Sequence, residues 1–113
     1  MGFGLFAEVA GDTVAVIIDG RGATPVIVAG TGVRNVVRES QGTYLMEVDG
    51  AQLSYSGSTP MVIECHRYRT AAPPGSGGYA TSDIISPTQM RIRTYSNSGV
   101  IDALFAVRIR RYP

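Results

Sequence analysis

Two stretches near the C-terminal end of the chain alternate between apolar and charged side chains with a period of two residues. A β-strand points successive side chains to opposite faces, so this alternation is typical of strands with one face in a core and one in solvent. The inward residues are predicted to be Met90, Ile92 and Thr94 in the first stretch and Phe105, Val107 and Ile109 in the second. The polar segment 96–99 between them predicts that the two strands pair with each other as an antiparallel hairpin.

The rest of the chain consists of short β-prone runs separated by Gly, Pro, Asp and Ser, and apolar residues follow a helical spacing for no more than about two turns. Further strands are predicted at 4–10, 13–19, 25–29, 33–39, 43–48 and 60–69. Segment 79–85 is expected either to begin the penultimate strand or to extend the loop before it. The Gly11-Asp12 pair is expected to turn the chain between the first two, and Pro25 suits an edge strand or a strand start. The chain of 113 residues is therefore expected to be all-β, a single domain over 1–113 that folds as an antiparallel β-sandwich of about eight short strands.

Segment 70–78 is the one low-complexity stretch, and it contains Pro73 and Pro74 among glycines and serines. It is expected to be a flexible loop or an extended arm that reaches a neighbouring subunit. Cys65 is the only cysteine, so an internal disulfide is excluded and assembly in a reducing cytoplasm is favoured. We expect no signal peptide and no membrane insertion, because no apolar run approaches the roughly 18 residues that span a bilayer.

The chain contains arginine but no lysine, and its formal net charge is +1. A charge this low does not favour nucleic-acid binding, although arginines beside aromatic residues on a strand face can follow a phosphate backbone. The alternative, which we prefer, is that the arginine-bearing faces pack against acidic neighbours within a subunit or between subunits. The candidate interface residues are Arg91, Arg93, Arg108, Arg110, Tyr95, Pro73 and Pro74.

The sequence predicts no catalytic, metal or cofactor site. Cys65 and His66 are adjacent on a predicted strand, so their side chains should point to opposite faces and cannot act as a couple. The glycine clusters at 30–32 and 75–78 lack the following helix whose N-terminus would hold a phosphate. A non-enzymatic protein is therefore expected.

The pattern from Met90 to Gly99, followed by Asp102 to Ile109, resembles the closing hairpin of small β-sandwich domains in structural proteins of tailed-bacteriophage virions. Gly42-Thr43-Tyr44 is similar to an earlier strand of such domains, and the opening Met1–Phe6 is similar to short proteins of phage tail tips. The resemblance implies a virion subunit at the tail tip or tail fibre, or a capsid decoration or head-fibre protein. It also implies assembly in the bacterial host cytoplasm with other virion structural proteins, as a homo-oligomer and specifically a trimer.

A function of a different class stays open beside this one. The chain could be a module that binds a host receptor or surface carbohydrate, since sugar sites favour exposed aromatic and planar polar groups. Tyr55, Tyr68, Tyr79 and Tyr95 are the aromatic candidates for such a site.

Overall fold

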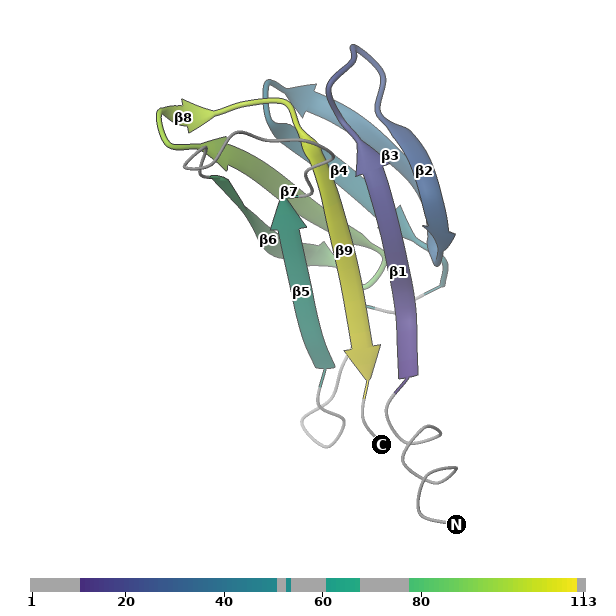
Figure 1. Cartoon of the computed structure of the whole chain (residues 1–113). Coiled ribbons are helices and arrows are strands. Elements are labelled where there is room, and N and C mark those ends of the chain that lie inside the picture. The colour runs from purple at the N-terminus through teal and green to yellow at the C-terminus, as the bar shows by residue number, and fades with distance from the viewer. Residues whose placement is uncertain (1–10, 51–52, 54–60, 68–77, 112–113) are drawn as a thin grey trace.

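The computed structural model describes residues 11–50, 53, 61–67 and 78–111, and every structural statement below concerns these residues. They form nine strands in two antiparallel sheets (Figure 1). In spatial order, sheet A contains β2 (Val26–Thr31), β1 (Gly11–Asp19), β9 (Leu104–Arg111) and β5 (Met61–Arg67). Sheet B contains β3 (Val33–Ser40), β4 (Thr43–Val48), β7 (Gln89–Ser96) and β6 (Gly78–Ser86), and the short β8 (Gly99–Val100) pairs with β7. The predicted all-β, antiparallel sandwich is confirmed.

The core lies between the two sheets, and alternation along the strands builds it. The six residues that the C-terminal alternation predicts to point inward are all buried. Tyr44 and Phe105, from opposite sheets, are completely buried, and their rings pack with centroids 4.9 Å apart. An aromatic pair of this kind contributes about 0.5–1.5 kcal/mol beyond the area that it buries.

The predicted pairing of the two C-terminal strands is wrong, because β7 and β9 belong to different sheets. β7 pairs with β4, β6 and β8, whereas β9 pairs with β1 and β5. After the turn at Asn97-Ser98 the chain forms only the two-residue β8. It then crosses to the other sheet, where the Gly20 amide donates to the Ala103 carbonyl oxygen (3.0 Å). Alternation therefore places the side chains correctly but does not identify the partner strand.

The expected turn at Gly11-Asp12 is also wrong, since both residues begin β1 and lie opposite Arg111 and Arg110 of β9. The strand predicted at 4–10 lies outside the described residues. Gly32 alone separates β2 from β3, although these strands are in different sheets. Its φ of 97° lies in the left-handed region, and a Cβ there would stand 2.5 Å from the Thr13 carbonyl oxygen, so this sharp crossing requires glycine.

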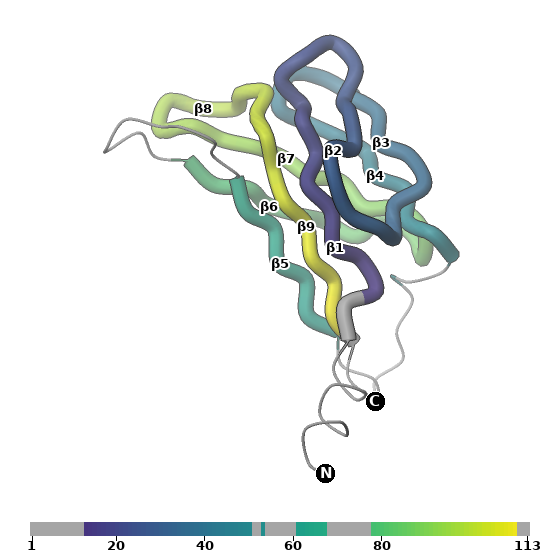
Figure 2. Tube along the Cα trace, turned by 45° about the vertical axis from the view of Figure 1, so that its right-hand side comes forward, coloured from purple at the N-terminus to yellow at the C-terminus, as the bar shows by residue number. Residues whose placement is uncertain are grey.

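Each sheet ends in two edge strands, and the edges of the two sheets coincide in pairs. β2 and β3 form one lateral side of the sandwich, which we call the β2/β3 side (Figure 2). β5 and β6 form the opposite side, the β5/β6 side, where the two strands contact each other. These two sides carry the open edges of the described fold.

Candidate functional site

The four predicted interface arginines point outward, but they do not form one surface. Arg91 and Arg93 lie on the outer face of sheet B, on β7. Arg108 and Arg110 lie on the outer face of sheet A, on β9. The sandwich core separates the two pairs, so they could contact a partner only on two opposite faces of the subunit.

The outer arginines of sheet B have acidic partners within the same sheet. Arg91 Nε donates to Glu39 Oε1 (2.7 Å), and Arg93 donates to Asp83 Oδ2 (3.1 Å). The hydrogen bond from Arg91 holds the pKa of the Glu39 carboxyl below its usual value. Both pairs join different strands of one sheet. This agrees with the prediction that the arginine-bearing faces pack against acidic neighbours within a subunit.

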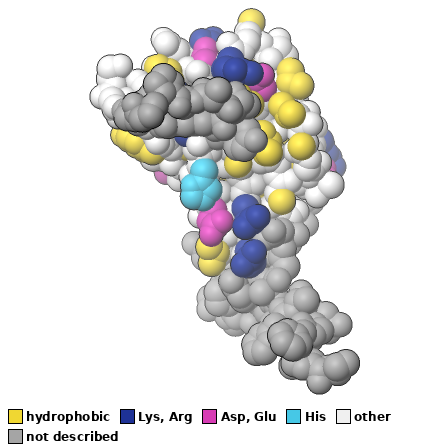
Figure 3. Space-filling model, in the orientation of Figure 1, with side chains coloured by type: hydrophobic (Ala, Val, Ile, Leu, Met, Phe, Trp, Pro, Cys, Tyr) yellow, Lys and Arg dark blue, Asp and Glu magenta, His cyan; other side chains and the backbone are white. Residues whose placement is uncertain are grey.

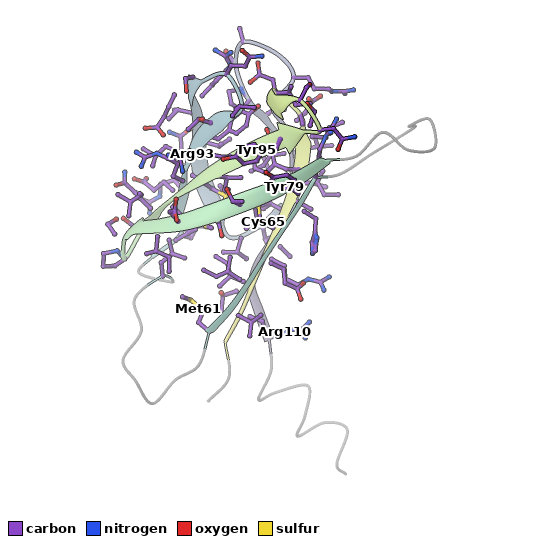
Figure 4. All side chains as sticks on the ribbon, turned by 90° about the vertical axis from the view of Figure 1, so that its left-hand side faces the viewer. Met61, Cys65, Tyr79, Arg93, Tyr95 and Arg110 are labelled. Atoms are coloured by element: carbon purple, nitrogen blue, oxygen red, sulfur yellow. The ribbon has the colours of Figure 1, made fainter. Side chains whose placement is uncertain are left out.

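Tyr95 lies beside the edge strand β6 and packs against an aromatic partner. Its ring stacks on Tyr79 with centroids 4.7 Å apart and an interplanar angle of 14°, and both side chains are labelled in Figure 4. Tyr79 is 57% exposed, so the pair forms an aromatic patch at the β5/β6 side. Pro73 and Pro74, the other predicted contact residues, lie outside the described residues, as do Tyr55 and Tyr68.

The outer face of sheet A carries a shallow hollow of about 440 Å³. Small apolar residues form its floor, among them Ala15, Ala29 and Ala106, while Glu64 and His66 stand on β5 at its border. Figure 3 shows the histidine on this face, with acidic and basic side chains directly below it. Arg108 on β9 also lines the hollow, and its Nη1 lies 4.0 Å from Glu64 Oε2.

Cys65 and His66 point to opposite faces, as predicted. His66 is exposed, whereas Cys65 packs against the core, and burial raises the pKa of its thiol to about 12. A thiol with that pKa stays protonated near neutral pH and is a poor nucleophile. Within the described ranges, no three His, Cys, Asp or Glu side chains come together as a metal site, and no helix is long and apolar enough to cross a membrane.

A polar cluster around the buried Tyr44 and the partly buried Asp102 was not recognised in the sequence. The Tyr44 hydroxyl donates to the Gly20 carbonyl oxygen (2.8 Å) and lies 3.1 Å from Asp102 Oδ1. Asp102 also accepts from the Gly42 amide (2.7 Å) and from Arg38 Nε (3.1 Å). The Arg38 hydrogen bond is the main cause of the lowered pKa of Asp102, and burial raises the pKa of Tyr44 to about 12. The cluster joins three connections of the fold, so its role is structural.

The clearest surface feature is apolar, and sequence reasoning did not single it out. Nine large hydrophobic side chains of the described residues are exposed, and eight of them lie on the four edge strands. They are Val26, Ile27 and Val28 on β2, Val37 on β3, Val62 on β5, and Tyr79, Ile84 and Ile85 on β6. The signal in the sequence is the uncharged run of β2 directly after Pro25, which marks an edge strand without protecting charges.

Comparisons of the chain with protein-family profiles, with curated proteins and with solved structures find no match. The resemblance to tailed-phage structural proteins therefore depends on the residue pattern alone.

Proposed function

We propose that this chain is a non-enzymatic structural subunit of a tailed-phage virion, associated with the tail tip or tail fibre. It acts through protein–protein assembly, with copies of itself and with other virion structural proteins, and it is assembled in the cytoplasm of the bacterial host. The capsid surface, as a decoration or head-fibre protein, is the alternative position. The phage assignment is based on the residue pattern of the sequence. The assembly role is based on the exposed apolar side chains of the edge strands.

The observation that carries the assembly role is the concentration of exposed apolar side chains on edge strands. Soluble monomeric β-proteins protect their edges with charged residues, prolines or covering loops, because an unpaired edge offers hydrogen-bonding groups to another chain. Here β2 carries no charged residue, and Val26 and Val28 are each 57% exposed. A large apolar surface of this kind is typical of a protein–protein contact site.

The chain is expected to be a component of purified virus particles. Particles released by lysis of the host would be purified by density gradient and examined by mass spectrometry, and an antibody against the chain would be located on them by immunogold electron microscopy. Peptides of the chain should copurify with the particles, and gold should label the tail. Label on the head would support the capsid alternative, whereas recovery of the chain only in the soluble fraction would contradict a virion role.

A host-binding role has one surface in its favour, the stacked Tyr79–Tyr95 pair at the β5/β6 side. Exposed aromatic rings beside planar polar groups suit a sugar face, and Arg93, which binds Asp83, lies two residues from Tyr95 on the same strand. A glycan array probed with the purified chain separates this role from pure assembly.

A further inference from the structure

We infer that copies of this chain associate head to tail, with the β2/β3 side of one copy docked on the β5/β6 side of the next. The inference rests on the proposed assembly role and specifies its contact surfaces. Each copy then presents two different surfaces to two neighbours. Such a contact closes into a ring when the rotation between copies allows it.

The first argument is the even division of the exposed apolar side chains between the two sides. Four lie on the β2/β3 side and four on the β5/β6 side. The register places Val26, Val37, Val62 and Tyr79 on the outer faces of the sheets, whereas Ile27 and Ile84 lie opposite the buried Ile18 and Met90 and so face the space between the sheets. A two-fold dimer through either side would leave the inward-facing isoleucine of the other side in water. A head-to-tail contact covers both with a single kind of interface.

The second argument is charge. β2 has no charged residue, and β3 has two arginines and one glutamate, so the β2/β3 side has a formal charge of +1. β5 and β6 together have Glu64, Asp83 and Arg67, so the β5/β6 side has a charge of −1 when His66 is neutral. Ion pairs within the subunit reduce this difference, since Arg34 lies 3.9 Å from Asp49 and Asp83 lies 3.1 Å from Arg93. The Arg34 and Asp83 side chains are still 67% and 64% exposed, so charge makes a small contribution that favours contact between unlike sides.

The third argument is strand direction. All neighbouring strands in both sheets are antiparallel, and the main path of each sheet has four strands, so its two edge strands run in opposite directions. Two copies placed side by side in the same orientation therefore bring together antiparallel edges, in sheet A and in sheet B alike. Antiparallel pairing is the arrangement that the subunit already uses, and it is slightly more stable per residue than parallel pairing.

Complementation between two blocked variants tests the inference. Val28→Asp blocks the β2/β3 side and Ile85→Asp blocks the β5/β6 side. Each substituted residue is exposed and is the extra residue of a bulge, so neither change removes a cross-strand partner. Val100→Asp, which is exposed on β8 and not on any of the four edge strands, is the matched control. Native mass spectrometry of each variant, and of a mixture with one variant isotopically labelled, is the measurement.

Each blocked variant alone should lose the assembled species and appear at the monomer mass of 12.0 kDa, while Val100→Asp assembles like the unmodified chain. The mixture should contain a species of twice that mass with one copy of each variant, because one intact side of each kind remains. A mixture without this species would overturn the inference. So would a result in which only one variant loses association, since that indicates a two-fold contact through one side.

Both blocked variants must be folded. Cooperative thermal unfolding, measured by circular dichroism, is the check. If either fails to fold, Val26→Asp or Tyr79→Asp replaces it, since both residues are 57% exposed on the corresponding side. The proposed virion role is tested separately by recovery of the chain in particles. A chain found in particles but without mixed dimers would retain the structural role and lose the head-to-tail contact.

Discussion

Replacing Phe105 with alanine is expected to lower the free energy of unfolding by about 3–5 kcal/mol. Phe105 is completely buried on β9, the strand between β1 and β5 in sheet A, and its ring packs against Tyr44 of sheet B. Alanine would remove the contact between the sheets and leave a cavity that rigid strands on both sides cannot close. Since a domain of this size has about 5–15 kcal/mol of stability, much of it would be lost.

Urea unfolding followed by circular dichroism measures this loss, with the variant and the unmodified chain at the same concentration, because association raises apparent stability. Val100→Ala is the control. Val100 is 38% exposed on β8, so its truncation should change the unfolding free energy by no more than about 0.5 kcal/mol. Similar losses for the two variants would contradict the position assigned to Phe105 in the core.

Replacing Asp102 with alanine is expected to cost about 1–3 kcal/mol, because the buried Gly42 amide loses the acceptor on which it depends. Tyr44→Phe, which removes only the hydroxyl, should cost about 1 kcal/mol. The two changes should be non-additive, since Tyr44 and Asp102 are in one hydrogen-bond cluster. A double-mutant cycle from urea unfolding measures the coupling, and strict additivity would show that the cluster does not act as a unit.

The same carboxylate predicts a dependence of stability on pH. The pKa of Asp102 is lowered in the folded chain, first by Arg38 and then by the Gly42 amide and Tyr44. Its contribution is therefore present above the unfolded value of about 3.9 and is lost as the pH falls through the folded pKa. Asp102→Asn should flatten this acid loss. Glu39→Gln is the control, since Glu39 has a similar arginine partner and lies on the exposed surface, so it should flatten the loss much less.

Local pattern was sufficient for most of the strands and for the direction of their side chains. The predicted strand at 43–48 matches β4, and the inward and outward residues of β7 and β9 are as alternation indicates. The pairing of β7 with β9 was wrong because the crossing between the sheets depends on contacts distant in sequence. One of these is the hydrogen bond from the Tyr44 hydroxyl to the Gly20 carbonyl oxygen. The local sequence around either residue does not predict this contact.

The candidate surface could be predicted only in part. The outward arginines follow from alternation, but their acidic partners do not, since Glu39 reaches Arg91 across the intervening strand β4. The apolar edges were missed because a short hydrophobic run such as Val26-Ile27-Val28 has the same pattern in a buried strand and in an exposed edge strand. Pro25 before this run suits an edge strand or a strand start, and the order of the strands in the sheets shows that β2 is an edge strand.

The central claim is that the two lateral sides make this chain an assembling subunit. Sedimentation equilibrium of the unmodified full chain at micromolar concentrations tests this claim most directly. Our account predicts a mass that corresponds to more than two copies of the 12.0-kDa chain. This mass stays constant over a tenfold rise in concentration if the copies close into a ring, and it rises with concentration if they form an open chain. A mass of 12.0 kDa throughout that range would contradict it.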